Sequence, residues 1–373
     1  MTGAALNTSH IHPVRRWFGS AGSVALGVFL LGRLALEPLR DLPVYDNRGV
    51  DAYSAIETYL LRDNPVLPKI AFFGTSQSVW DVVASDFATD WGLDPGEVRN
   101  LSTEGGTPFD IWNMVRRNEG KLKELRLAIV EVNPLVLRHG MDTDPRVRVD
   151  VAQHATLRER LLISDRRERA WHVAEWALPV RAVRQPLRNV FLNVLNPQPG
   201  HPIYPYANAR VTPVADWRAE NAGQHQTKAR KLVPPELAAK RFVGGWRLSK
   251  LQDHSLRQAL QWFASHGVRV IFHELPVHPE VHRVIRDDGA IQRGHANFIS
   301  YLDTLPPPAA RFLNLDPAAF GIEPLHMADR THCNELGAHL YSHQLAAMIR
   351  PFLPRSAPSG KSEEGSEPPA EAP

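Results

Sequence analysis

The sequence predicts an α/β protein built on a central parallel sheet of five strands. Short apolar runs alternate with amphipathic stretches along most of the chain, a pattern typical of helices covering a parallel sheet. Several of these runs stop abruptly at glycine, serine or asparagine, as buried strands do where they enter a turn. The composition, with 43% hydrophobic and 22% charged residues, indicates a globular protein with a sizeable core.

Each expected element follows from a local pattern. The apolar runs predict strands over residues 69–74, 97–101, 127–132, 268–275 and 311–315. Amphipathic spacing predicts helices over residues 108–119, 251–266 and 335–349. The last helix follows Asn334, which is a suitable N-cap because its side-chain oxygen can accept a hydrogen bond from an unpaired N–H of the first turn.

At 373 residues the chain exceeds the usual size of one domain, and we expect three parts. These are an anchor segment over residues 1–40, a main domain over 41–354 and a disordered tail over 355–373, which contains almost nothing to bury. Residues 137–248 interrupt the alternation with helical patterns, a Pro-rich loop and many arginines, and we expect them to form an insertion beside the sheet. The arginines form either a solvated face of ion pairs or a surface for anionic glycans or lipid headgroups.

The N-terminal segment determines the expected location. Residues 18–32 carry no charge, and if Arg33 extends its charge to the interface, the apolar span reaches the length of about 20 residues that a membrane helix needs. Arg15 and Arg16 precede the span, so we expect a retained signal anchor with the main domain on the extracytoplasmic, periplasmic side. A cleaved signal peptide and a buried soluble helix are the alternatives.

Charge and cysteine content exclude several classes of function. The net charge of only +3 gives no reason to expect a nucleic-acid partner. Cys333 is the single cysteine, which excludes an internal disulfide and a Cys-rich metal site. Glu335, His339 and His343 recur every four residues, but we interpret them as the polar face of a helix rather than as metal ligands. We therefore expect neither a metal nor a cofactor.

Polar motifs stand where predicted strands end. Ser76 follows the first strand in Gly74-Thr75-Ser76, Gly105 lies in the loop after the second, and Asn133 closes the third. Asp329 and His332 follow the last strand and precede the final helix. Because the carboxyl ends of parallel strands lie at one edge of a sheet, we expect these residues to form one site.

Together these motifs resemble the four sequence blocks of the SGNH (GDSL-like) hydrolase superfamily, over about residues 68–134 and 266–350. The resemblance implies a three-layer, flavodoxin-like fold with Ser76 as nucleophile, His332 as base and Asp329 as the triad acid. It also implies an oxyanion hole formed by the backbone N–H groups of Ser76 and Gly105 and the side chain of Asn133. The usual Gly-Asp-Ser reads Gly-Thr-Ser here, and the neighbours of Asn133 depart from the third block.

The chemistry of these residue types agrees with those roles. A serine hydroxyl attacks an ester only when an imidazole takes its proton, and a carboxylate on the other ring nitrogen stabilises the resulting imidazolium. Each donor to the oxyanion is typically worth about 3 kcal/mol. His273 and Glu274 follow the fourth strand and are expected at the rim of the cleft, in contact with substrate, although ordinary loop polarity also explains them.

Within the superfamily, the architecture is most similar to the membrane-tethered branch that transfers acyl groups onto cell-envelope polymers. That resemblance implies a serine esterase or O-acyltransferase, active in polysaccharide O-acetylation or a related reaction. Its ligands would be acylated carbohydrate or an acyl donor, and its partner a membrane-bound acyl-transfer protein. The alternative is a non-catalytic envelope-assembly or polysaccharide-binding protein on a degenerate scaffold, which Thr75 and the poorly matching third block would also fit.

Overall fold

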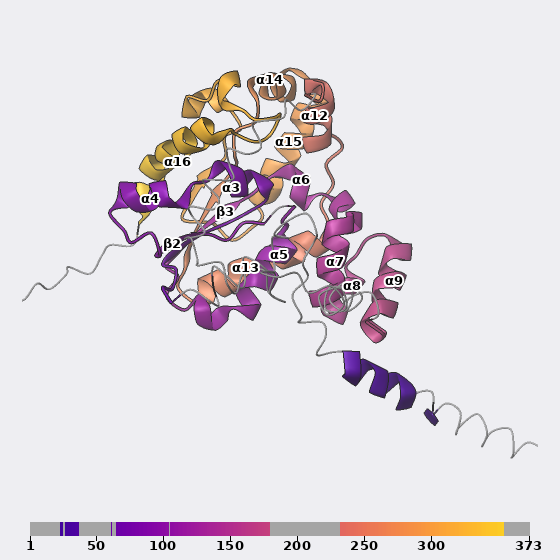
Figure 1. Cartoon of the computed structure of the whole chain (residues 1–373). Helices are drawn as coiled ribbons and strands as arrows, with labels where there is room; N and C mark the ends of the chain where they lie inside the picture. Colours follow the sequence, from indigo (N-terminus) through magenta and orange to yellow (C-terminus); the bar gives the residue numbers. More distant parts are fainter. Residues whose placement is uncertain are drawn as a thin grey trace, which may run out of the picture.

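The computed structural model describes residues 23–24, 27–36, 61, 65–103, 105–179 and 232–353. Within them it confirms the predicted α/β class, since five parallel strands form one sheet in the order β2-β1-β3-β4-β5 (Figure 1). The strands are β1 (Ile70–Phe73), β2 (Val98–Asn100), β3 (Leu127–Glu131), β4 (Arg269–His273) and β5 (Ala310–Phe312). Each lies within or beside a predicted apolar run.

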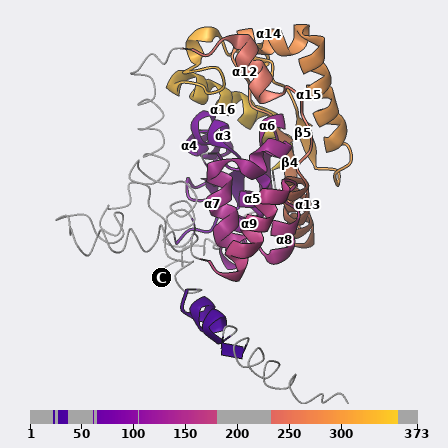
Figure 2. The same cartoon turned by 90° about the vertical axis from the view of Figure 1, so that its right-hand side faces the viewer.

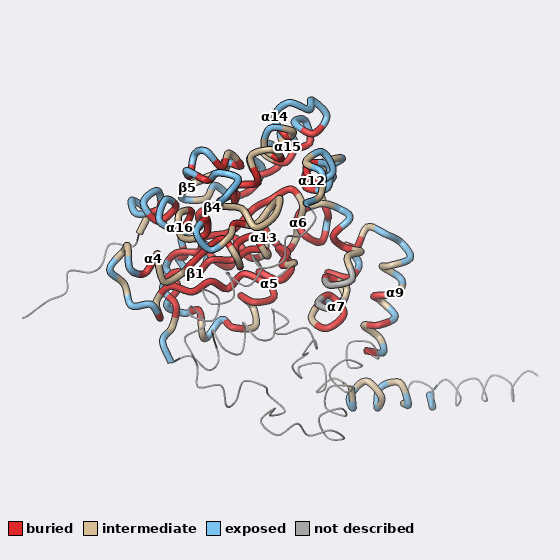
Figure 3. Tube along the Cα trace, turned by 45° about the horizontal axis from the view of Figure 1, so that its top comes forward, coloured by how far each residue is buried: buried red, intermediate tan, exposed pale blue. Residues whose placement is uncertain are grey.

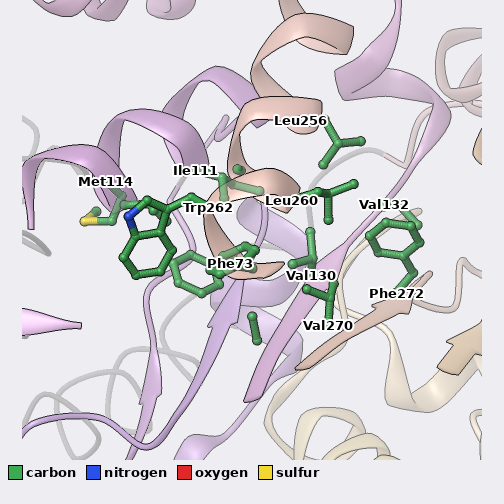
Figure 4. Close-up of a cluster of buried hydrophobic side chains, with 14 of the residues drawn as sticks. Phe73, Ile111, Met114, Val130, Val132, Leu256, Leu260, Trp262, Val270 and Phe272 are labelled. Atoms are coloured by element: carbon green, nitrogen blue, oxygen red, sulfur yellow. The ribbon is translucent and has the colours of Figure 1, made fainter. Parts of the chain in front are cut away.

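Alternate side chains of the strands belong to two separate cores. One face of the sheet packs on α5 (Pro108–Arg117) and α13 (Lys250–Ser265), as Figure 4 shows for strand residues Phe73, Val130 and Phe272. The other face contributes to a second core that includes residues of α4 (Ala84–Trp91) and α16 (Glu335–Ile349). The sheet is therefore a layer between helices, in which β1, β2 and β3 are buried along their whole length and the edge strand β5 is only partly buried (Figure 3).

Three helices match the predicted ranges, namely α5, α13 and α16, and Asn334 caps α16 by accepting a hydrogen bond from Gly337 N at 3.0 Å. The sequence reading did not anticipate four others. These are α3 (Ser76–Asp81), α4, α14 (Pro279–Asp287) and α15 (Gly289–Leu302).

The described part of the predicted insertion is helical. It comprises α7 (Pro145–His154), α8 (Leu157–Leu161), α9 (Arg166–Ala177) and α12 (Pro235–Phe242), and the short helix α6 (Pro134–Leu137) leads into it. In Figure 2, α7, α8 and α9 lie together, whereas α12 lies beside α14 near the other end of the molecule. The buried Arg160 links α7, α8 and α9 by donating to backbone carbonyls of Ala152, Ala155 and His172.

Residues 27–36 of the predicted anchor are helical, and Arg33 donates from Nη1 to the carbonyl oxygen of Trp176 at 2.9 Å. Its guanidinium also lies 4.3 Å from the centre of the Trp176 ring. Among the described residues, no helix is both long enough and apolar enough to cross a bilayer. The rest of the anchor segment apart from residues 23–24, residues 180–231 of the insertion and the tail over 355–373 lie outside the described residues.

Candidate active site

The structure brings Ser76, His332 and Asp329 together in one hydrogen-bonded chain. Ser76 Oγ lies 2.9 Å from His332 Nε2, and His332 Nδ1 lies 2.9 Å from Asp329 Oδ2. With the Nδ1 proton directed at the carboxylate, Nε2 is left to accept the proton of the Ser76 hydroxyl. The side chains of His332 and Asp329 remain 24% and 25% exposed, and Ser76 is also only partly buried, so a ligand can reach the chain of atoms.

A tight turn explains the spacing of Asp329 and His332. Met327 pairs with Cys333 in an antiparallel bridge, and Ala328 N donates to the carbonyl oxygen of His332 at 2.9 Å. Asp329 Oδ1 accepts from the backbone N–H groups of Thr331 at 2.7 Å and His332 at 3.0 Å. The carboxylate thus holds the turn closed and stands beside the imidazole at the same time.

The neighbouring elements fix this turn in place. Gln77 Nε2, from α3, donates to the carbonyl oxygen of Thr331 at 2.8 Å. Arg330 donates to the carbonyl oxygen of Val233 at 2.9 Å and forms an ion pair with Glu280 of α14. The loop that carries the imidazole is therefore hydrogen-bonded directly to the helix that begins at Ser76.

The surroundings of His332 favour its charged form. Burial by itself lowers the pKa of His332, but the hydrogen bond and charge of Asp329 and the charges of Asp81 and Glu131 raise it above its usual value. Burial acts in the opposite direction on Asp329, yet the bonds from His332 and the turn hold the pKa of that carboxyl below its usual range. The pair is thus arranged to stabilise an imidazolium.

The loop after β2 brings Gly105 to the same edge of the sheet. Thr103 N donates to the carbonyl oxygen of Gly74 at 3.1 Å, which attaches the loop to the turn before Ser76. Gly105 has a φ of 69°, a left-handed conformation that glycine adopts without a steric penalty. Within the described residues, the backbone N–H groups of Ser76 and Gly105 donate to no acceptor of the protein.

Asn133 is more strongly engaged than predicted. Its Oδ1 accepts from Val136 N at 3.1 Å and so caps α6, and its Nδ2 donates to Glu131 Oε1 at 2.5 Å. The side chain is 2% exposed. One amide proton is therefore used inside the protein, which leaves at most the second for a bound oxyanion.

The expected position of His273 and Glu274 at the rim of a cleft is wrong, because both residues have no exposed surface. His273 Nδ1 lies 3.1 Å from the hydroxyl of Tyr341 on α16, and burial lowers the pKa of His273 to about 3. Glu274 Oε1 lies 2.9 Å from His295 Nε2 on α15, and burial raises the pKa of Glu274. Helices α15 and α16 cover side chains that the end of a strand would otherwise expose.

Two buried carboxylates near the site were not singled out from the sequence. Asp81, at the end of α3, accepts from Cys333 N at 2.8 Å, and burial raises the pKa of Asp81 to about 8. Glu131, the last residue of β3, accepts hydrogen bonds from the turn around Ser76. A charged residue inside the apolar run 127–132 was the signal, since a buried carboxylate requires several donors.

The polar face of α16 has ordinary partners. His339 Nδ1 lies 2.6 Å from Asp86 Oδ2, and His343 Nδ1 lies 2.7 Å from Asp90 Oδ2. No cluster of three or more potential metal ligands occurs in the described part of the chain.

Comparison with known proteins adds little to this geometry. No protein-family model matches the chain, and no curated protein matches it. Among solved structures, the chain is similar to a Bacteroides fragilis protein described as a "putative acylhydrolase", at 11% sequence identity and a TM-score of 0.34. The alignment covers 83% of this chain and 99% of that one. A similarity at this level carries no argument about activity.

Proposed function

We propose that the chain is a serine-dependent acyl ester hydrolase or acyltransferase of the SGNH type. The observation that carries the proposal is the chain of contacts from Ser76 Oγ through His332 to Asp329, at 2.9 Å for each step. Three residues from opposite ends of the sequence meet in the order that a nucleophile, a base and an orienting carboxylate require.

The geometry supports a two-step reaction. As Ser76 Oγ attacks the ester carbonyl, its proton moves to His332 Nε2, and the resulting oxyanion accepts hydrogen bonds from the N–H groups of Ser76 and Gly105. When the ester bond breaks, His332 returns the proton to the leaving alcohol, and the acyl group remains on Ser76. A water molecule or a sugar hydroxyl then takes the acyl group by the reverse sequence of proton transfers.

The substrate and location extend the same proposal. We infer that the acyl group belongs to, or is transferred onto, an extracytoplasmic polysaccharide, and that the N-terminal segment retains the protein at the membrane. The uncharged segment over 18–32 and the preceding arginines support this inference. Fractionation of cells that express the full chain tests it, because removal of residues 1–40 should then move the protein out of the membrane fraction.

Hydrolysis of a short-chain nitrophenyl ester tests the catalytic proposal. Ser76→Ala should abolish release of nitrophenol, whereas Ser265→Ala, a serine of α13, should leave it unchanged. Equal activity of the wild type and Ser76→Ala would refute the proposal and favour a non-catalytic scaffold. Acylation of an added oligosaccharide would distinguish transfer from hydrolysis.

A further inference from the structure

Glu131 is a buried carboxylate whose partners are all uncharged. It ends β3 on the same face of the sheet as Leu127 and Ile129, and it is 3% exposed. No lysine, arginine or histidine of the described residues forms an ion pair with it. Such a carboxylate is retained in a protein interior only if hydrogen-bond donors replace its lost water.

Five donors surround the two oxygens of Glu131. Oε2 accepts from Thr75 N at 2.7 Å, Ser78 N at 3.2 Å and Ser78 Oγ at 2.7 Å. Oε1 accepts from Thr75 Oγ1 at 2.8 Å and from Asn133 Nδ2 at 2.5 Å. Four of the five donors thus come from the residues on either side of Ser76, which fixes the backbone that carries its hydroxyl.

The Glu131 carboxylate fills the space in which a side chain at position 74 would lie. A Cβ atom at position 74 would lie 2.4 Å from Glu131 Oε2 and 2.7 Å from Glu131 Cβ, both closer than side chains tolerate. The glycine of the Gly-Thr-Ser turn is therefore needed because the carboxylate fills the space beside it. Turn and carboxylate form one packed unit, although they are far apart in the sequence.

We propose that Glu131 is a positioning residue, which acts through Thr75, Ser78 and Asn133 to hold Ser76 Oγ within hydrogen-bond distance of His332 Nε2. This inference rests on the proposed function. In the proposed role, Glu131 does not contact the substrate. Its hydrogen bond to Asn133 also orients the amide that the oxyanion hole requires. A second effect follows from its charge, because a carboxylate on this face helps to stabilise the imidazolium of His332.

Glu131→Gln and Glu131→Asp separate the two effects. The glutamine keeps the size of the side chain, but its amide N–H groups face donors that one of the two carboxylate oxygens accepted from. We therefore expect kcat to fall about 100-fold, the scale of one lost catalytic contact, while KM changes less than about threefold. Its acid limb in the pH profile should also move to lower pH, because one negative charge near His332 is lost. The aspartate keeps the charge but is too short, so kcat should fall without a shift of the limb.

Glu159→Gln is the matched control. Glu159 is also buried and accepts from Trp112, Arg116 and Thr156, but all its partners belong to α5 and α8 or its N-cap. It should lose stability as Glu131→Gln does and keep the wild-type kcat per folded molecule. Equal kcat values in all three variants and the wild type, or equal losses in Glu131→Gln and Glu159→Gln, would overturn the positioning role.

An NMR titration of the His332 ring distinguishes failure of this inference from failure of the proposed function. If the wild type hydrolyses no ester, the proposed function fails, but the His332 signal still reports on Glu131. Glu131→Gln should lower the titration midpoint of His332 and alter the shift of Nε2, the nitrogen that faces Ser76. An unchanged Nε2 signal and midpoint would exclude the role of Glu131 whether or not the protein is active.

Discussion

The protonation of His332 predicts how activity depends on pH. A neutral imidazole must accept the Ser76 proton, and the pKa of His332 is raised above its usual value of 6.5. Activity should therefore be lost as the pH falls through this raised pKa, and the acid limb of kcat/KM should have its midpoint above pH 6.5. A profile measured on a nitrophenyl ester would contradict this expectation if the midpoint lay below pH 6.

Replacing Asp329 tests the cause of that shift. Asp329→Asn removes the charge and the hydrogen bond that raise the pKa of His332, while burial, which lowers it, remains. The acid limb should move to lower pH, and kcat should fall by roughly 10³- to 10⁴-fold because the ring loses its orienting carboxylate. Asp316→Asn is a suitable control, since Asp316 is paired with His282 and not with the site. A lower kcat without movement of the limb would argue against the stated cause.

A site residue could be recognised from the sequence when its partners lie close to it along the chain. Asp329 and His332 share a turn of four residues, and the carboxylate contacts the imidazole within it, so their spacing carried the information. Ser76 was marked by the glycine at the end of a strand. The role of Glu131 depends on where another segment places its donors, and the burial of His273 depends on α16, so neither could be predicted from neighbours in the chain.

At the scale of elements, strands were predicted better than helices. A strand buried on both faces, such as β1, is a short apolar run, and each of the five predicted ranges contains or overlaps a strand. Helix α3 is only six residues long, and α14 buries just Val281 and Ile285, so neither shows a long periodic pattern. Short helices of this kind form where the loops fold back at the edge of the sheet. A short stretch of sequence does not show this folding, because it depends on the tertiary structure.

The packing of α16 against the preceding loop predicts a destabilising substitution. A Cβ atom at Gly337 would lie 2.2 Å from the carbonyl oxygen of His326, which is backbone and cannot move aside cheaply. Gly337→Ala should therefore lower the free energy of unfolding by about 1 to 3 kcal/mol, as overpacking does. Urea denaturation measures the change.

Gly289 of α15 is the matched control for Gly337. The nearest atom to its hypothetical Cβ is Arg293 Nη1 at 3.6 Å, an ordinary contact at the end of a flexible side chain. Gly289→Ala should be neutral or raise the free energy of unfolding by up to about 1 kcal/mol, because alanine loses less entropy on folding. Equal effects of the two substitutions would show that the contact at Gly337 is not the cause.

At the scale of the whole molecule, one face of the sheet packs on a core of apolar side chains, and the other face carries the buried polar groups near the candidate site. The core with α5 and α13 receives apolar side chains from β1, β3 and β4, whereas Glu131 and His273 face the side of α3 and α16. The sequence predicted the helix layers and a common edge of the sheet for the motifs. It could not predict which face would carry the buried polar groups, because that depends on how the distant C-terminal helix docks.

This division predicts that core substitutions on the two sides have different consequences for activity. Phe263→Ala, on α13, removes a buried ring 5.5 Å from that of Phe73 and should cost about 3 to 5 kcal/mol of stability. Phe320→Ala removes a ring 4.9 Å from that of Tyr341 and should cost a similar amount. Tyr341 belongs to α16, which begins shortly after His332, so the second cavity lets the helix and the imidazole shift.

Activity per folded molecule should therefore remain near the wild-type value in Phe263→Ala and fall in Phe320→Ala. The measurement combines denaturation, which gives the folded fraction, with titration of Ser76 by a phosphonate, which gives the number of competent sites. In Phe263→Ala, the folded fraction and the number of competent sites should decline together. In Phe320→Ala, the number of competent sites, or the rate at which they are labelled, should fall by more than the folded fraction does. The opposite ranking would mean that α13, and not α16, controls the position of His332.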